Sequence, residues 1–193
     1  GDYGFRVQLS LYLNRARGTS ANPDNIIITN GAAQSFNLLC QLIPKDSYAL
    51  VENPISCGIL HTLKSNNVNV QPIELDEHGM ITEELPSIPP KLIFTTPSHQ
   101  FPTGVILPAK RRIELIKYAK YYDTYIVEDD YDSQFRFDGN PIQAMQYLDP
   151  ERVIYVGTFS KTLMPALRIG YMILPKALFE QVRKAKYMND IYS

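Results

Sequence analysis

Residues 158–170 read Thr-Phe-Ser-Lys-Thr-Leu-Met-Pro-Ala-Leu-Arg-Ile-Gly, and this stretch is the most informative one about the fold. The apolar run before it, Val-Ile-Tyr-Val-Gly at 153–157, predicts a buried strand. A lysine, Lys161, therefore follows a strand end among small hydroxyl residues, and Arg168 stands seven positions later. Polar and cationic side chains at a strand end are typical of α/β proteins, in which ligands gather beyond the carboxyl ends of the strands.

The rest of the chain alternates between predicted strands and predicted helices. The pattern predicts strands at 23–29, 48–52, 68–73, 91–95, 124–128, 153–157 and 169–174. It predicts helices at 5–17, 31–43, 56–65, 108–122 and 175–189, with Gly18 and Pro44 as stop signals. We therefore expect one α/β domain over residues 1–193, with three α-β-α layers and a mostly parallel central sheet.

The composition is that of an ordinary soluble globular domain. The 193 residues are 45% hydrophobic and 20% charged, and 19 basic against 20 acidic residues give a net charge of −1. No basic stripe indicates nucleic-acid binding by this piece, and the short basic groups at 110–112 and 183–186 are predicted on solvated helix faces. No long apolar run or signal pattern indicates a membrane span or export.

Two cysteines, Cys40 and Cys57, form no disulfide framework, which favours the reducing cytoplasm, and Cys40 is expected in the core.

The side chains of the stretch 158–170 indicate a site for pyridoxal phosphate (PLP). Lys161 can join the aldehyde of this cofactor as a Schiff base. Thr158, Ser160 and Arg168 can hold its phosphate, because a planar guanidinium makes bidentate, charge-assisted bonds to phosphate oxygens. A serine-lysine pair alone would carry little information, so the prediction depends on the segments around it.

An acidic run, Glu-Asp-Asp-Tyr-Asp at 128–132, follows the predicted strand at 124–128. PLP chemistry needs a carboxylate that pairs with the pyridinium nitrogen, keeps it protonated and so makes the ring an electron sink. The tyrosine of the run can donate to the phenolic oxygen of the cofactor. An acidic run after a strand can instead bind Mg²⁺, although no phosphate loop of the type G-x-x-x-x-G-K-[ST] accompanies it here.

Two more segments of interest come directly after predicted strands. Asn-Gly-Ala-Ala-Gln at 30–34 opens a helix, and its small residues let backbone N–H groups approach an anion, although it also fits an ordinary helix start. Thr-Thr-Pro-Ser-His-Gln-Phe-Pro-Thr-Gly at 95–104 contains a fixed Pro-Thr-Gly turn and offers Ser98, His99 and Gln100 to the edge of a ring. A lone histidine is more often structural, and no second His or Cys stands at the spacing of a zinc site.

These four segments, in this order and spacing, resemble the large domain of fold-type I PLP-dependent aminotransferases. More narrowly, Pro-Ser-His-Gln-Phe-Pro-Thr-Gly at 97–104 and Glu-Asp-Asp-Tyr-Asp-Ser-Gln-Phe at 128–135 resemble the MocR subfamily of GntR-type transcriptional regulators. Ordinary aminotransferases usually read Asn-Pro-Thr-Gly in the first of these segments. Phe101 takes the Asn position, a substitution typical of MocR proteins. The resemblance covers residues 1 to about 186.

The resemblance implies a role for each matching residue. Lys161 matches the Schiff-base lysine, Asp129 the pyridinium partner and Tyr131 the donor to the phenolic oxygen. The residues that match the phosphate ligands are Ala32, Ala33, Thr158, Ser160 and Arg168, while Ser98 and His99 are predicted to contact the cofactor ring.

One position departs from the family. The segment Glu-Asn-Pro-Ile-Ser-Cys at 52–57 normally holds an aromatic residue that stacks on the PLP ring. Ser56 stands at that position, or Ile55 if the alignment shifts by one residue. Loss of the stacking would weaken retention of the cofactor by about 0.5–1.5 kcal/mol.

The MocR resemblance implies a PLP-binding domain that senses an amino acid or amine effector for a transcriptional regulator. Such regulators reach DNA through an N-terminal winged helix, and a C-terminal small domain usually supplies the arginine for the substrate carboxylate. Neither segment is found in residues 1–193, so we expect a large-domain fragment of a longer protein, which would be a homodimer.

One alternative is the catalytic large domain of a class I/II aminotransferase acting on an amino acid and a 2-oxo acid, since it needs the same lysine, aspartate and arginine. A second alternative is a folded core that holds no PLP.

Overall fold

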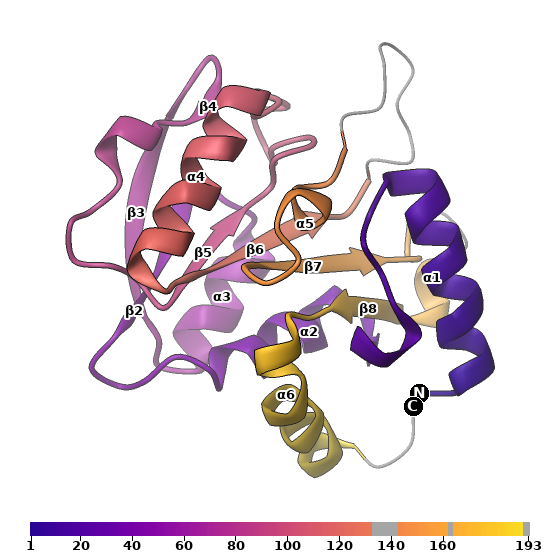
Figure 1. Ribbon diagram of the computed structural model, residues 1–193. Coiled ribbons are helices and arrows are strands. Elements are labelled where there is room, and N and C mark those ends of the chain that lie inside the picture. The colour runs from indigo at the N-terminus through magenta and orange to yellow at the C-terminus, as the bar shows by residue number, and fades with distance from the viewer. Residues whose placement is uncertain (133–142, 162–163, 191–193) are drawn as a thin grey trace.

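The computed structural model describes residues 1–132, 143–161 and 164–190, and over these residues one eight-stranded sheet lies between two layers of helices (Figure 1). The strand order is β1-β8-β7-β6-β5-β2-β3-β4. The strands are β1 (Ile26–Asn30), β2 (Tyr48–Asn53), β3 (Asn69–Asp76), β4 (Gly79–Met80), β5 (Leu92–Thr95), β6 (Tyr125–Asp130), β7 (Val153–Thr158) and β8 (Ile169–Ile173). The predicted α/β class with its central sheet is confirmed.

The middle of the sheet is parallel and its margins are not. Strands β3, β2, β5, β6 and β7 pair in parallel, whereas β8 runs antiparallel to both β7 and β1, and β4 runs antiparallel to β3. The reversal of β8 places Gly170 opposite Thr158 at the end of β7. Arg168, just before β8, is thereby brought to the edge where the parallel strands end.

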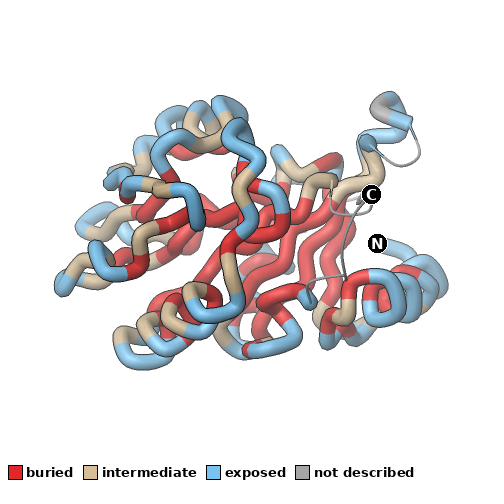
Figure 2. Tube along the Cα trace, turned by 90° about the horizontal axis from the view of Figure 1, so that it is seen from above, coloured by how far each residue is buried: buried red, intermediate tan, exposed pale blue. Residues whose placement is uncertain are grey.

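Helices cover both faces of the sheet. They are α1 (Tyr3–Arg17), α2 (Gly31–Cys40), α3 (Cys57–Ser65), α4 (Ala109–Tyr122), α5 (Met145–Leu148) and α6 (Lys176–Asn189), with short 3₁₀ turns at 23–25, 82–84 and 165–167. The core residues of α2, α3 and α6 pack on one face, and those of α1 and α4 pack on the other. Figure 2 shows the buried strands running between the more exposed outer segments. Gly18 ends α1 in the left-handed conformation at φ +58°, as its stop signal predicts.

Alternation along the strands explains why apolar clusters form on both faces of the sheet. Successive side chains of a strand point to opposite faces, so neighbouring apolar residues enter different cores. In β6, Ile126 packs with Leu115 of α4, and Val127 packs in the cluster that contains Phe36 of α2. The continuous apolar runs of the sequence are therefore explained by strands buried on both faces.

The predicted end of helix α2 needs correction. Helix α2 ends at Cys40 rather than at residue 43, because the backbone tightens into i→i−3 bonds such as Leu42 N–H to Leu39 C=O at 3.0 Å. Cys40 is buried, as predicted. No helix in the described ranges is long and apolar enough to cross a membrane.

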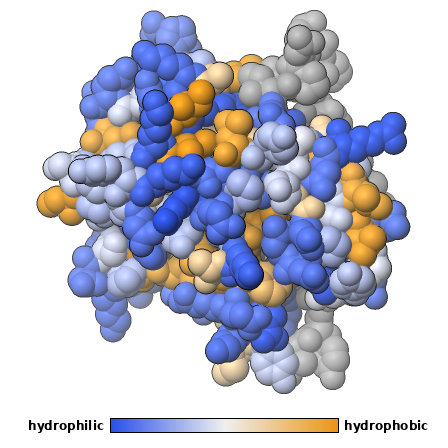
Figure 3. Space-filling model, viewed as in Figure 1, coloured by the Kyte–Doolittle hydropathy of each residue, from blue (hydrophilic) through white to orange (hydrophobic). Residues whose placement is uncertain are grey.

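The predicted solvated helix faces are wrong for Arg112 in the group 110–112 and for Lys186 in the group 183–186, because both side chains are buried. The Arg112 Nε donates to the Leu107 carbonyl at 2.8 Å and its Nη2 to the Pro97 carbonyl at 2.6 Å. These carbonyls satisfy the guanidinium inside the protein, so Arg112 braces the loop after β5 instead of meeting water. The face of the molecule drawn in Figure 3 is mostly hydrophilic, with groups of apolar side chains between the polar ones.

Candidate functional site

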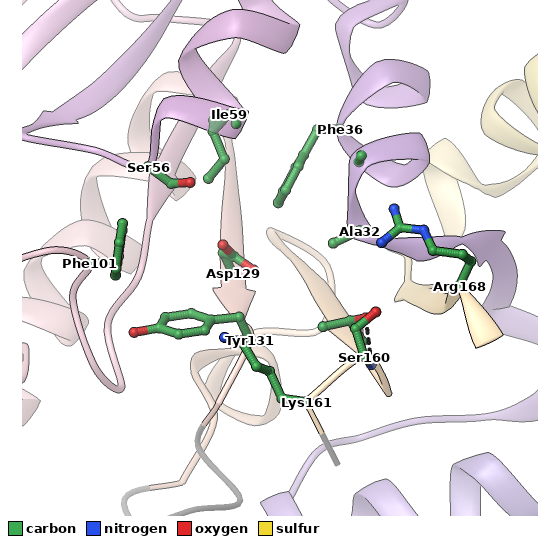
Figure 4. Close-up of a pocket in the computed structure, with 13 residues that line it drawn as sticks. Ala32, Phe36, Ser56, Ile59, Phe101, Asp129, Tyr131, Ser160, Lys161 and Arg168 are labelled. Carbon is green, nitrogen blue, oxygen red and sulfur yellow. Dashed lines mark hydrogen bonds between the residues drawn. The ribbon is translucent and has the colours of Figure 1, made fainter. Parts of the chain in front are cut away.

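A cavity of about 370 Å³ opens at the carboxyl edge of the sheet, beside the N-terminal ends of α2 and α3 (Figure 4). It brings together the four segments singled out in the sequence, although they are far apart along the chain. The described residues that line it are Ala32, Ala33, Phe36, Ser56, Gly58, Ile59, Phe101, Asp129, Tyr131, Thr158, Ser160, Lys161 and Arg168. This position is the one expected for a ligand site in an open α/β sheet.

The first three residues of the acidic run, Glu128, Asp129 and Asp130, are part of strand β6, and only Tyr131 and Asp132 follow it. The sequence pattern had ended this strand at residue 128. Because side chains alternate along a strand, Asp129 faces the cavity while Glu128 and Asp130 face the opposite side of the sheet. There Glu128 accepts hydrogen bonds from the backbone N–H groups of Met145 and Gln146, each at 3.0 Å. The pleat thus separates the carboxylates, and no group of three possible metal ligands occurs among the residues that the structure describes.

Asp129 is the acid of the cavity, and it lacks a partner on one oxygen. Its Oδ1 is buried and forms no hydrogen bond within the described part of the chain. Burial raises the pKa of Asp129 to about 8, and the neighbouring acids Asp130, Glu52 and Asp132 raise it in the same direction. An unpaired buried carboxyl group is costly, and a cationic N–H donor in the cavity would remove that cost.

The opposite end of the cavity is built to hold an anion. A Cβ atom on Gly31 would lie 2.8 Å from Nη2 of Arg168, so the guanidinium packs directly against the first residue of α2. Asn30 provides no side-chain cap to this helix, which leaves its N-terminal N–H groups to be satisfied by another acceptor. A helix N-terminus and a guanidinium beside each other favour a phosphate or carboxylate.

Two hydroxyl groups lie at the same end of the cavity. Thr158 Oγ1 donates to Ser160 Oγ at 3.0 Å and accepts from the Ser160 N–H at 3.1 Å (Figure 4). Arg168 has φ +51°, a left-handed conformation that is unfavourable for a residue with a side chain. Such backbone strain of about 1–3 kcal/mol is concentrated at functional sites, where it directs a particular side chain.

Eight of the ten cofactor residues predicted from sequence line this one cavity, whereas Ser98 and His99 are not among the described lining residues. Ser98 is buried and accepts a hydrogen bond from Arg17 Nη2 at 3.2 Å. The His99 Nδ1 atom lies 2.6 Å from Asp132 Oδ2. The other parts of two predicted motifs, residues 133–135 and residues 162–163, lie outside the described residues.

Gln100, which the sequence offered to a ring edge, instead braces the loop. Its Nε2 donates to Glu52 at 3.2 Å and to the Pro54 carbonyl at 2.8 Å. Glu52 is buried and also accepts from the Thr95 hydroxyl at 2.6 Å. The pKa of Glu52 is raised, because burial outweighs the lowering by these hydrogen bonds. The end of β2 and the loop after β5 are therefore held together at the carboxyl edge of the sheet.

The sequence did not single out Phe36, Ile59 or Gly58 for the cavity. Phe36 follows Ala32 by four residues, one helical turn, so the same face of α2 that presents Ala32 also presents Phe36. This four-residue spacing is the sequence signal that could have identified Phe36 as a lining residue. Ser56 lines the cavity at the position where the family usually has an aromatic residue, whereas Ile55 packs against the core, which supports the unshifted alignment.

Comparisons with known proteins agree with this geometry. The family model Aminotransferase class I and II matches residues 1–188. The uncharacterized HTH-type transcriptional regulator YdeL of Bacillus subtilis is 38% identical over 100% of the chain and 41% of its own length. The probable rhizopine catabolism regulatory protein MocR of Rhizobium meliloti is 36% identical over 93% of the chain and 37% of its own length.

A solved structure shows the same fold. Pyrococcus horikoshii kynurenine aminotransferase superposes with a TM-score of 0.91 and 32% identity, over 99% of this chain and 50% of its own. The chain thus spans less than half of the two regulators and half of this enzyme. The similarity to MocR-type regulators that the sequence motifs predict is confirmed, and the chain belongs to the aminotransferase class I and II family.

Proposed function

We propose that the cavity binds PLP and that the domain serves a MocR-type regulator as its sensor of an amino acid or amine. The observation that carries the first part is Asp129, which lines the cavity and whose buried Oδ1 has no hydrogen-bond partner among the described residues. A pyridinium N–H⁺ is the donor that this carboxyl group lacks. The pairing would favour the ionised carboxylate and so reverse the effect of burial on its pKa.

The other residues fit the remaining parts of the same cofactor. Arg168, the N–H groups at the start of α2 and the hydroxyls of Thr158 and Ser160 would hold the phosphate. Lys161 would provide the amine that binds the cofactor covalently, and Tyr131 would donate to its phenolic oxygen. When bound, PLP supplies an aldehyde that reacts with amines and a ring that accepts electrons.

The regulatory role is supported by the relatives and by the segment at 97–104. YdeL and MocR are named as regulators, and the chain has the phenylalanine, Phe101, that is typical of MocR proteins where aminotransferases usually have asparagine. Phe101 lines the cavity and offers it no hydrogen bond from its side chain. We propose that DNA is bound through another domain of a homodimeric parent protein.

An absorbance titration with PLP tests the cofactor. Binding at Lys161 should produce a visible band that is lost in Lys161→Ala and kept in Lys184→Ala, a matched change at an exposed lysine. Asp129→Asn should weaken binding, because the substituted amide cannot balance the charge of a pyridinium. A band that persists unchanged in Lys161→Ala would exclude the covalent role of this lysine.

Turnover by the protein that carries this chain separates a sensor from a transaminase. The PLP-loaded protein would be mixed with an amino acid and a 2-oxo acid, and both half-reactions would be followed. A sensor should respond to the amino acid in its spectrum with slow release of product or none. Rapid turnover of both half-reactions would favour the catalytic alternative.

A further inference from the structure

The buried side chain of Gln100 uses every hydrogen-bonding group that it has. Its Nε2 donates to Glu52 Oε2 at 3.2 Å and to the Pro54 carbonyl at 2.8 Å. Its Oε1 accepts from the N–H of Thr103 at 3.0 Å and from the Thr103 hydroxyl at 2.7 Å. An amide offers two donor hydrogens and two acceptor lone pairs, so all four are satisfied. One side chain thus joins the end of β2 to the turn at 100–105.

This turn carries Phe101, and backbone hydrogen bonds close it. The Gln100 N–H donates to the Val105 carbonyl at 2.9 Å, and the Gly104 N–H donates to the Gln100 carbonyl at 2.7 Å. Phe101 lines the cavity from this turn and meets the Tyr131 ring edge-on, with centroids 6.1 Å apart and planes at 81°. Because Phe101 is half exposed, the position of its ring depends largely on the turn that carries it.

The other segment that the amide joins carries Ser56. The Pro54 carbonyl belongs to the second residue before Ser56, and both Ser56 and Phe101 line the cavity. Figure 4 shows these two residues on the side of the cavity away from Arg168. Ile59 lies on the same side, and none of the three side chains carries a charge. This side therefore suits the uncharged part of a ligand whose anionic group is held by Arg168.

The carboxyl group of Glu52, the second acceptor of the amide, is surrounded by donors. It accepts from the Thr95 hydroxyl at 2.6 Å, and from the N–H and the hydroxyl of Thr96 at 3.2 Å each. Gln100 suits this place because an amide donates to Glu52 and Pro54 and accepts within its own turn at the same time. A methionine has none of these groups, and a glutamate has at most one proton and cannot donate to both acceptors. Substitution of Gln100 therefore releases the turn from the end of β2.

We propose that Gln100 is a positioning residue for the ligand of the cavity, because it holds the turn of Phe101 against the segment of Ser56 and so sets the space between them. Gln100 is not among the described residues that line the cavity, so it acts through these two residues and not by contact with the ligand. The inference rests on the proposed function in one respect, that the ligand is PLP with its phosphate held by Arg168. Loss of the Gln100 bonds should then weaken binding of the cofactor ring and leave binding of the phosphate intact.

Nuclear magnetic resonance of the cofactor-free protein tests the positioning without a ligand. Cross-peaks between the Phe101 and Tyr131 rings, assigned by their loss in Phe101→Leu, should be present in the wild type. They should be lost or strongly weakened in Gln100→Met, and kept in Gln181→Met, at an exposed glutamine of α6. If Gln100→Met does not fold, Gln100→Glu takes its place, since it keeps the acceptor side of the amide and loses its donation. Cross-peaks at full strength in either folded variant would overturn the proposal.

Two affinities of each variant test the consequence for the ligand. Inorganic phosphate, measured by its competition with PLP, probes the Arg168 end of the cavity alone, whereas PLP reaches both ends. Gln100→Met should weaken PLP binding about threefold to tenfold, the range expected for one hydrogen bond, and leave the phosphate affinity unchanged. Gln100→Glu adds a charge that repels both anions, so there the ratio of the PLP affinity to the phosphate affinity should fall. An equal loss for both ligands, or no loss for PLP, would overturn the proposal.

The two tests separate this inference from the proposed function. If PLP does not bind to the wild type, the proposed function fails, and the ring contact in the cofactor-free protein still decides whether Gln100 positions Phe101. If PLP binds equally well to the wild type and to Gln100→Met, the proposed cofactor stands and the positioning role of Gln100 is wrong.

Discussion

Arg17 Nε donates to Asp130 Oδ2 across 2.7 Å, and the two side chains are only 3% and 1% exposed. The Tyr155 hydroxyl donates to the same oxygen. The pair ties α1 to β6 directly beneath the cavity, since Asp130 follows Asp129 and points to the opposite face of the sheet. Arg17 also donates to Ser98, so one buried guanidinium supports both the strand and the loop that border the site.

Removing one partner of this pair should destabilise the fold strongly. Arg17→Met leaves Asp130 as a buried charge without a counterion, and such losses typically cost about 3–5 kcal/mol. Urea unfolding of the cofactor-free protein measures the change in free energy of unfolding. Arg183→Met, which breaks an exposed ion pair with Glu180, should leave the free energy of unfolding nearly unchanged, because solvent screens an exposed pair. Similar small costs for both variants would show that the Arg17–Asp130 pair contributes little.

The pH dependence of stability should report Asp129. Its pKa is raised from an ordinary 3.8 to about 8 in the folded protein, so the folded state binds the proton more tightly than the unfolded state. Stability from this group is therefore complete below pH 3.8 and is lost as the pH rises through about 8. Asp129→Asn should flatten the decline of cofactor-free stability by up to about 1.4 kcal/mol per pH unit.

Thermal or urea melts at several pH values measure this slope. Glu52 and Glu128, whose pKa values burial also raises, remain in both proteins, so the comparison largely subtracts them. Asp46→Asn, at an exposed position, should keep the slope of the wild type. An unchanged slope in Asp129→Asn would mean that Asp129 is already ionised in the cofactor-free protein.

Gly170 permits the close approach of β8 to the start of α2. A Cβ atom there would overlap the backbone carbonyl carbon of Gly31 and lie 2.8 Å from the Ala32 nitrogen. Gly170→Ala should therefore destabilise the protein by about 2 kcal/mol or more and displace the helix N-terminus that faces the cavity. In Gly58→Ala the new Cβ would lie 3.6 Å from Ser56 Oγ, an ordinary contact, so helix propensity should make it neutral or stabilising. Unfolding measurements that ranked the two variants equally would contradict this packing argument.

Ser56 stands where a stacking aromatic would strengthen cofactor binding. Ser56→Tyr should tighten PLP retention roughly 2- to 13-fold, the equivalent of about 0.5–1.5 kcal/mol of ring contact. Dissociation constants from absorbance titrations measure the effect. Ser65→Tyr, at the exposed C-terminal end of α3, the helix that follows Ser56, provides the control and should leave affinity unchanged. If Ser56→Tyr weakens binding, the space beside Ser56 is not available to the ring.

Much of this arrangement was predictable because local patterns determine it. Apolar runs with turn signals identified the strands, and the carboxyl ends of parallel strands meet at one edge, so the segments at 128–132 and 158–170 were expected to converge. The convergence of Ala32 with Arg168 depended on the reversed strand β8, which no local pattern distinguishes from a parallel one. The family resemblance supplied that part.

The remaining features depend on partners far along the chain. Arg112 looked solvent-exposed because its helix pattern does not reveal the carbonyls of Leu107 and Pro97 that surround it. Strand β6 continues through three acids because Glu128 finds backbone donors of α5 and Asp130 finds Arg17, 113 residues away. Sequence alone could not tell which way His99 turns, since its contact with Asp132 arises only in the folded loop.

The proposed function depends above all on Lys161 binding PLP in this cavity. Incubation with PLP, reduction with borohydride, digestion and mass spectrometry would locate the covalent bond directly. We predict a stoichiometric adduct on the peptide that contains Lys161, its loss in Lys161→Ala and its retention in Lys184→Ala. An adduct spread evenly over exposed lysines, or one that is equally abundant in Lys161→Ala, would contradict this role of Lys161.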